Sequence, residues 1–366
     1  MPSSFSPNPP ARRKNWARPV LTAIFALLVC LGVVFYWRPL WVIDEATRAL
    51  LCLAGFNSES VQLGPYRIHF YAGGRGNPLV LVHGLGGKAE NWAAMMPPLS
   101  RHGYRVYAPD LLGFGRSDRP DVNYSIALQT DVLLQFFDSQ HLTRADLGGW
   151  SMGGWVVLKF ALAHPERVRR VVVYDSAGVY FKPQFDPTLF RSATLEQAKQ
   201  LLALLTPQAS RIPRFVARDL IREARPRAWV VDRSMQSMQA GADLLNGQLQ
   251  SLQVPVLIVW GKQDVLLPLP AARRYNVRYP GRLWRYLTAA VIWRRRSAAI
   301  ASLPRHFTSS RPNLRCRPLG ASFHSERTSG GQPTPPLQLG SDEPAGCPLA
   351  TGTVRASSLA DAALCG

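Results

Sequence analysis

Short apolar runs alternate with helical periodicity over residues 66–281 of this 366-residue chain. Runs of strand length that are rich in β-branched side chains lie at residues 78–82, 105–108, 145–147, 168–174 and 254–260. Between them, apolar side chains recur at helical spacing, most clearly at residues 125–140 and 153–164. Strands that alternate with helices predict a mostly parallel sheet covered on both faces, so we expect an α/β, doubly wound fold.

A second pattern lies near the N-terminus, where the 18 residues 20–37 carry no charged side chain. This is about the shortest apolar helix that spans a bilayer. A cleavable signal peptide would have a shorter apolar core and a small-residue cleavage site, which Phe35, Tyr36 and Trp37 do not provide. Four basic residues precede the stretch. We therefore predict a single-pass signal anchor with a cytoplasmic N-terminus and the following domain on the outer (periplasmic or extracellular) side. The alternative is a buried core helix.

The most informative motif joins the predicted strand at 145–147 to the predicted helix at 153–164. It reads Gly-x-Ser-x-Gly, with Ser151 between Gly149 and Gly153. A serine at such a sharp turn adopts a strained backbone that exposes its hydroxyl, and glycines on either side permit the close approach of strand and helix. The new helix directs its first N–H groups at the same point. The pattern predicts a nucleophile for acyl transfer; the alternative is a glycine-rich turn with a solvated serine.

Further motifs surround this one in a fixed order. A His83-Gly84 turn follows the first strand, and a Gly-rich loop occupies residues 110–117. The motif Trp-Gly-Lys-Gln-Asp at residues 260–264 ends in Asp264, just after the strand at 254–260. With these motifs, residues 66–281 resemble the α/β-hydrolase fold family. The resemblance implies a sheet of the α/β-hydrolase type with a helical cap inserted at 178–250, which would exclude water from the serine and shape an apolar acyl pocket. Gly148 departs from the family pattern, which has an apolar residue there.

The resemblance also implies roles for individual residues. Ser151 would be the nucleophile, and the main-chain N–H groups of Met152 and of Leu85, or of Gly86, would form the oxyanion hole. The remaining polar residues of the motifs, Asp110, Arg116 and His83, would mainly shape loops.

The acid that orients the catalytic histidine is assigned to Asp264, and Asp175 at the end of the strand at 168–174 is the alternative acid. Asp264 could instead be a loop residue that caps the following helix. The histidine itself should come one helix and one strand after the acid. Residues 283–296 contain no histidine, which leaves His306 as an alternative base with no strand predicted before it.

Composition changes at residue 282. Residues 282–366 contain eleven arginines, no lysine, four acidic residues and three of the five cysteines, and they are rich in Pro, Ser and Gly. Such a segment cannot bury enough apolar surface to offset its ordering entropy. We therefore predict that the last strand and helix of the fold are missing and that the chain ends in a truncated or disordered tail.

We interpret this change as a shifted reading frame that begins near Arg282. Residues 288–293 must be encoded by ACN-GCN-GCN-GTN-ATH-TGG. Reading the same bases one position earlier permits Asp-Gly-Cys-Gly-His-Leu, a Gly-His turn of the kind that the resembled family carries. The alternatives are genuine loss of the histidine and an unusual tail.

The formal net charge of +20 raises the question of nucleic-acid binding. Much of the excess lies in the two terminal segments and no nucleic-acid-binding motif is present, so attraction to an anionic membrane surface is the better interpretation. Cys30 lies in the apolar stretch, and Cys52 alone among the cysteines lies in residues 38–281. No disulfide framework or zinc spacing follows. We expect no cofactor, no metal and no obligate protein partner.

These patterns set the predicted boundaries. They are a basic tail (1–19), a transmembrane anchor (20–37), a linker and amphipathic segment (38–65), the hydrolase core (66–177 and 251–281), the cap (178–250) and the aberrant tail (282–366). The predicted function is a membrane-anchored serine hydrolase that cleaves hydrophobic or lipid-like carboxylic esters through an acyl-enzyme. The alternatives are a non-catalytic or inactive homologue that lacks its histidine, and a cofactor-free perhydrolase or C–C bond hydrolase.

Overall fold

The computed structural model describes residues 17–191, 193–205, 213–261, 264–268 and 275, together with the backbone of residues 283–287. All of the described residues belong to one compact unit.

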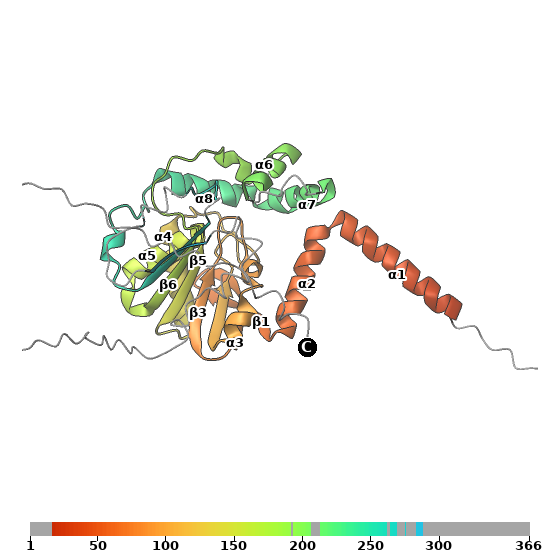
Figure 1. Cartoon of the computed structure of the whole chain (residues 1–366), viewed down its shortest axis with the longest axis horizontal. Helices are drawn as coiled ribbons and strands as arrows, with labels where there is room; N and C mark the ends of the chain where they lie inside the picture. Colours follow the sequence, from red (N-terminus) through yellow and green to blue (C-terminus); the bar gives the residue numbers. More distant parts are fainter. Residues whose placement is uncertain are drawn as a thin grey trace, which may run out of the picture. The chain divides into compact units, whose positions relative to one another are not determined.

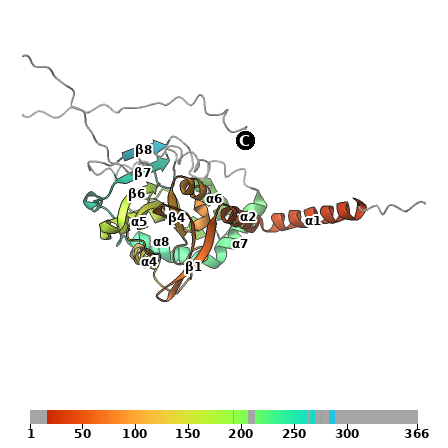
Figure 2. The same cartoon turned by 90° about the horizontal axis from the view of Figure 1, so that it is seen from below.

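An eight-stranded sheet forms the centre of the described part (Figures 1 and 2). Its strands are β1 (Phe56–Leu63), β2 (Tyr66–Gly74), β3 (Asn77–Val82), β4 (Tyr104–Pro109), β5 (Ala145–Trp150), β6 (Val168–Tyr174), β7 (Val256–Gly261) and β8 (Leu283–Leu287). They lie in the order β1-β2-β4-β3-β5-β6-β7-β8. The pairs β1–β2 and β2–β4 are antiparallel and the others are parallel, which confirms the predicted α/β sheet.

Helices cover both faces of this sheet. One face packs against α4 (Ile126–Ser139) and α5 (Met152–Ala163), and the other against α2 (Pro39–Leu53), η1 (Ala89–Trp92) and α3 (Met96–Arg101), while η2 (Pro165–Arg167) leads into β6. The alternation of side chains along β3 separates the two cores, because Val80 and Val82 belong to the first and Leu79 and Leu81 to the second. Both faces are therefore apolar, as expected for parallel strands.

The predicted helical cap lies between β6 and β7 in sequence and over one end of the sheet (Figure 1). It consists of η3 (Pro187–Arg191), α6 (Leu195–Leu205), α7 (Arg214–Ala224), η5 (Arg225–Arg227), α8 (Ala228–Ala240) and η6 (Leu249–Ser251). Gly241 adopts a left-handed conformation, with φ of 76°, and this ends α8.

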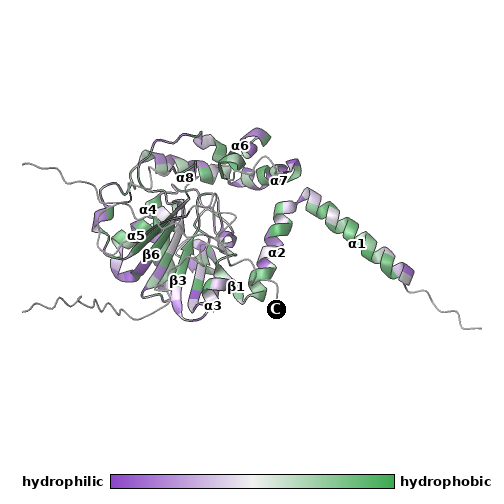
Figure 3. Ribbon diagram, in the orientation of Figure 1, coloured by the Kyte–Doolittle hydropathy of each residue, from purple (hydrophilic) through white to green (hydrophobic). Residues whose placement is uncertain are grey.

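The apolar N-terminal stretch forms helix α1 (Ala17–Trp37). Among the described residues, it is the one helix long and apolar enough to cross a membrane; its segment Arg18–Trp37 has a mean hydropathy of 2.5 and none of it is buried (Figure 3). By length and composition, α1 therefore has the properties predicted for the anchor.

At two places the sheet extends beyond the predicted segment boundaries. The predicted linker at residues 38–65 contains strand β1, which pairs with β2 from its first residue to its last. Most of the side chains of β1 are exposed and polar, so this edge strand lacks the apolar alternation by which a strand is recognised. The predicted structureless tail begins with strand β8, which pairs in parallel with β7 (Figure 2). Leucine and aromatic residues make this short segment a good strand former, and it covers an edge of β7 that would otherwise be unpaired.

Candidate active site

Ser151 occupies the turn between β5 and α5. Its φ of 54° and ψ of −119° lie in a region that residues other than glycine rarely adopt. Backbone hydrogen bonds hold the turn, since Ser151 N–H donates to the Tyr174 carbonyl at 3.0 Å and the Ser151 carbonyl accepts from Ala177 N–H at 3.1 Å. The strained backbone that the motif predicts is confirmed, while the role of Ser151 as nucleophile stays a prediction.

The two glycines of the motif leave no space for a side chain. A Cβ added at Gly153 would lie 2.2 Å from the Val82 carbonyl oxygen, and one added at Gly149 would lie 2.4 Å from the Gly153 carbonyl oxygen. Both obstacles are backbone atoms, which cannot rotate away. The elbow therefore depends on glycine at both positions, as predicted.

We expect Gly153→Ala to destabilise the fold by about 3 kcal/mol or more, because the new Cβ would push β3 away from α5. For a domain of this size this corresponds to a fall in melting temperature of roughly 6 to 12 °C, which circular dichroism can measure. The matched control is Gly148→Ala, whose Cβ would have its closest contact, at 2.6 Å, with the end of the Leu81 side chain and not with a backbone atom. Equal melting temperatures for the two variants would contradict this packing argument.

The predicted oxyanion donors lie on two segments next to Ser151. Met152 is the first residue of α5, and Leu85 follows the His83-Gly84 turn after β3. A Cβ added at Gly84 would lie 3.1 Å from Ser151 Cβ, so this loop packs directly beside the serine. Among the described residues, neither Leu85 N–H nor Met152 N–H donates a hydrogen bond to another group. Both donors are thus available to a ligand.

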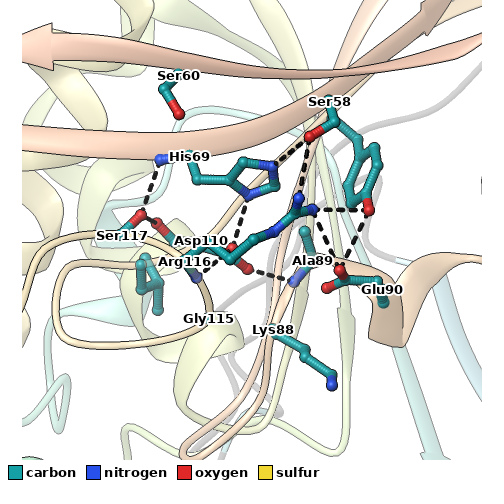
Figure 4. A network of polar contacts seen from close by, with 12 residues as sticks. Ser58, Ser60, His69, Lys88, Ala89, Glu90, Asp110, Gly115, Arg116 and Ser117 are labelled. Carbon is teal, nitrogen blue, oxygen red and sulfur yellow. Dashed lines mark hydrogen bonds and ion pairs between the residues drawn. The ribbon is translucent and has the colours of Figure 1, made fainter. Parts of the chain in front are cut away.

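Asp110 holds the chain just beyond Leu85 (Figure 4). Asp110 Oδ1 accepts a hydrogen bond from Ala89 N–H at 2.6 Å, while Oδ2 accepts one from Arg116 N–H at 2.9 Å and lies 2.7 Å from His69 Nδ1. Burial alone would raise the pKa of Asp110, but its hydrogen bonds with His69 and Arg116 hold the pKa below its ordinary value. An ionised Asp110 therefore fixes this loop, in keeping with the loop-shaping role expected for it.

A second acid extends this support to α2. Glu90 Oε1 lies 3.2 Å from Arg116 Nη2 and 3.4 Å from Arg48 Nε, and Arg48 belongs to α2 (Figure 4 shows the Glu90–Arg116 contact). Lys88, two residues earlier, pairs with Asp44 of the same helix. The helix that follows α1 is thus ion-paired to the segment that carries Leu85.

His83 is buried and neutral, with both ring nitrogens engaged. Its Nδ1 lies 2.8 Å from the Gly84 carbonyl oxygen and its Nε2 accepts a hydrogen bond from Leu111 N–H at 2.9 Å, which requires the proton on Nδ1. Burial lowers the pKa of His83 and so keeps this form. His83 fastens the turn to the next loop and has no free nitrogen for catalysis.

The two candidate acids lie at the carboxyl ends of neighbouring strands. Asp175 follows β6 with a φ of 39°, and its Oδ1 accepts a hydrogen bond from Gly261 N–H, the last residue of β7, at 2.7 Å. Asp264 follows β7, and its Oδ1 accepts hydrogen bonds at 2.8 Å from the N–H groups of Leu266 and Leu267. The structure thus brings together the assigned acid and its alternative, and the hydrogen bonds of Asp264 close a local turn.

No described histidine serves these acids. The five described histidines are His69, His83, His102, His141 and His164, and none of them is hydrogen-bonded to Ser151 or Asp264. His306, the alternative base, lies outside the described residues. The described part of the chain therefore contains the predicted nucleophile, the two predicted oxyanion donors and the two candidate acids, but no histidine bonded to Ser151 or Asp264.

Comparison with known proteins decides the family. A profile described as the alpha/beta hydrolase fold matches residues 77–233. The 2-hydroxymuconate semialdehyde hydrolase of Pseudomonas sp. (strain CF600) is 31% identical over 220 residues, which cover 56% of this chain and 76% of the relative. The chain belongs to the α/β-hydrolase fold family. The fold implied by the elbow and its surrounding motifs is thereby confirmed.

Two solved structures resemble this hydrolase. A bacterial membrane phospholipase A aligns with a TM-score of 0.61 and 25% identity, covering 74% of this chain and 90% of that one. The meta-cleavage product hydrolase from Pseudomonas fluorescens IP01 aligns with a TM-score of 0.59 and 26% identity, covering 66% and 93%. These relatives are hydrolases with different named substrates, so they establish a hydrolase fold and not a substrate.

The acid pair of this hydrolase predicts a pH-dependent stability. Burial, and then the charge of Asp264, raise the pKa of Asp175 well above its ordinary value, against the hydrogen bond from Gly261. The Asp175 carboxyl therefore binds its proton more tightly in the folded chain than in the unfolded chain. The stability that this proton contributes to the folded chain is lost as the pH rises through the raised pKa of Asp175. We expect Asp175→Asn to raise the melting temperature above that pH and to have no such effect below the ordinary pKa of aspartate.

Thermal melts over a pH series test this expectation. The exposed Asp131 of α4 has no hydrogen bond within the described part of the chain, so Asp131→Asn is the matched control and should change the melting temperature equally little at every pH. A pH-independent effect of Asp175→Asn would show that its carboxyl carries no proton linkage.

His69 and Glu90 help to hold the loop that follows Leu85, but neither belongs to a sequence motif. His69 lies in an apolar run of β2 and Glu90 in the short helix η1, and both are buried. Buried polar residues need partners, but the sequence does not say which loops supply them. The available signal is a polar residue within an otherwise apolar strand, which applies to His69 alone.

Proposed function

We propose that this chain is a serine hydrolase that works through an acyl-enzyme at Ser151. The Ser151 hydroxyl attacks the substrate carbonyl, and its proton passes to a histidine base and then to the leaving alcohol. The N–H groups of Leu85 and Met152 stabilise the oxyanion, and Asp264 orients the base. Water then hydrolyses the acyl-enzyme. The observation that carries this proposal is the strained Ser151 backbone beside two free N–H donors.

The base is proposed to follow strand β8. Parallel strands of such a sheet direct their carboxyl ends to one edge, where Ser151 follows β5 and Asp264 follows β7. Since β8 runs parallel to β7, the chain leaves Leu287 at this same edge. The next codons, for residues 288–293, are those that read Gly-His in the shifted frame. The order nucleophile, acid, base would then be complete. This argument favours a frame change after Leu287 and not at Arg282.

The proposed substrate is a hydrophobic, lipid-like carboxylic ester, and the proposed location is the outer side of a membrane anchored by α1. Two observations support this choice. The first is the length and composition of α1, and the second is the similarity to a membrane phospholipase A over 74% of the chain. The basic residues before α1 support an N-terminus on the cytoplasmic side.

The second candidate is a C–C bond hydrolase. The curated relative at 31% identity is a 2-hydroxymuconate semialdehyde hydrolase, and one similar structure is a meta-cleavage product hydrolase. These two similarities support the second candidate, as the similarity to the phospholipase A supports the ester. Both chemistries need an activated nucleophile and an oxyanion hole, which the elbow provides equally well.

A substrate panel separates the two candidates. The full chain in detergent micelles, in the written and in the shifted frame, is assayed with p-nitrophenyl octanoate and with 2-hydroxymuconate semialdehyde, with Ser151→Ala as the blank. We expect ester turnover above the blank and little cleavage of the semialdehyde. Turnover confined to the semialdehyde would replace the ester by the second candidate, and rates equal to the blank on both would contradict the serine hydrolase itself.

A further inference from the structure

The cap helix α7 is fastened to the end of the apolar helix α1. The Phe215 ring stacks on Tyr36 with ring centroids 5.4 Å apart and meets Phe35 edge-on at 6.2 Å. Arg222 Nη1 donates a hydrogen bond to the carbonyl oxygen of Trp37, the last residue of α1, at 2.6 Å. The two helices therefore meet where α1 ends (Figure 1). Wherever this end of α1 leaves a bilayer, α7 lies beside it.

The buried carboxylate of Asp219 stabilises the contact between α7 and the junction of α1 and α2. Asp219 of α7 is fully buried, accepts a hydrogen bond from Leu40 N–H of α2 at 2.9 Å and lies 3.4 Å from Arg38 Nε. Arg222 Nη1 lies 3.0 Å from the same carboxylate, and Glu223 lies 3.8 Å from Arg38 Nη2. Separating α7 from the α1–α2 junction would break the bonds of Asp219 to Leu40 and Arg38, the bond of Arg222 to Trp37 and the ring contacts of Phe215. The helix is thus held at a fixed place relative to the end of α1.

A row of arginines runs along α7 next to this contact. Arg214, Arg218 and Arg222 of α7 and Arg225 directly after it are spaced by four, four and three residues, which places them on one face, and all four are exposed. Within the described residues, no carboxylate pairs with Arg214, Arg218 or Arg225. Apart from Arg222, which pairs with Asp219, this face therefore presents positive charge that no carboxylate of the described residues neutralises.

We propose that this arginine face binds the phosphate groups of anionic phospholipids in the leaflet from which α1 emerges. The proposal rests on α1 as a membrane span and not on the catalytic chemistry. Phe35 and Tyr36 lie in the last turn of α1, so Phe215 shares the depth of the bilayer interface and the arginines lie at the level of the headgroups. The planar guanidinium group forms paired hydrogen bonds with phosphate oxygens, which suits it to this partner.

Amide hydrogen exchange on the full chain in nanodiscs tests the proposal. The chain is compared in discs of phosphatidylcholine and in discs that also contain phosphatidylglycerol. Each arginine at an anionic surface is worth roughly a fivefold factor, so two should slow local opening of residues 214–225 by roughly 25-fold in the anionic discs. The variant Arg214→Gln/Arg218→Gln should lose this slowing. The control Arg75→Gln/Arg101→Gln removes two exposed arginines at the opposite, amino end of the parallel strands and should retain it.

Three outcomes would overturn the proposal. These are equal exchange in the two kinds of disc, slowing that survives Arg214→Gln/Arg218→Gln, and equal loss in the control variant. Failure of the chain to co-elute with discs on size exclusion would instead refute α1 as an anchor. Neither result depends on turnover, so the catalytic proposal is tested separately.

Discussion

Restoring the reading frame after Leu287 is expected to raise ester turnover by about 10³- to 10⁶-fold over the chain as written. The physical reason is that nucleophile, base and acid act as a unit, so loss of the base costs nearly as much as loss of all three. None of the described histidines is hydrogen-bonded to Ser151, and both ring nitrogens of the nearby His83 are engaged elsewhere, whereas the shifted frame permits a histidine directly after β8. The measurement is the turnover of p-nitrophenyl octanoate by the written and the restored chain. Re-sequencing of the coding DNA over codons 273–296 shows which frame is the natural one.

A control variant distinguishes a base in the restored segment after β8 from a base at His306. In the written frame, His306→Ala should leave the residual turnover unchanged. If the written chain is instead as active as the restored one and His306→Ala abolishes that activity, then the base lies in the written tail and the frame hypothesis is wrong.

In a chain that carries a base, Ser151→Ala is expected to lower kcat by about 10⁴- to 10⁶-fold. The oxyanion donors are main-chain groups of Leu85 and Met152, so they survive the substitution and leave only modest residual catalysis. The change removes one oxygen atom, and the backbone hydrogen bonds that hold the turn do not involve it. The melting temperature should therefore stay close to that of the parent chain, which shows that the loss is chemical.

Ser176→Ala is the matched control for this prediction. Ser176 lies next to the elbow and its Oγ donates a hydrogen bond only to the neighbouring Ala177 carbonyl. We expect a change in kcat of less than about tenfold. Comparable losses in the two variants would mean that the region tolerates no substitution and that Ser151 has no special chemical role.

The sheet and the elbow could be predicted because their signals are local. Strand β6 matches the predicted residues 168–174 exactly in its bounds, and the strained Ser151 follows from the two flanking glycines. A close approach of backbone to backbone at Gly149 and Gly153 can be recognised from residue identity alone. Burial on both faces of the sheet likewise leaves a strong apolar pattern in the inner strands β3, β6 and β7.

The edges of the sheet could not be predicted, because their stability comes from pairing and not from burial. Strand β1 has a polar sequence and is recognised only by its partner β2, and β8 is short and flanked by a segment of unusual composition. The contacts that hold the segment carrying Leu85 could not be predicted for a related reason. Contacts such as Asp110 with Ala89 and Glu90 with Arg48 join residues that are far apart along the chain or lie on unrelated loops, and no spacing rule links them.

The most direct test of the central claim is to trap the acyl-enzyme analogue and find the residue that carries it. The full chain, in the written and in the restored frame, is treated with a fluorophosphonate, digested and mapped by mass spectrometry, with Ser151→Ala alongside. The account predicts one adduct, on Ser151, which forms fastest in the restored chain and is absent from the variant. Modification of a different serine that tracks the loss of turnover, or turnover in the restored chain without modification of Ser151, would contradict it.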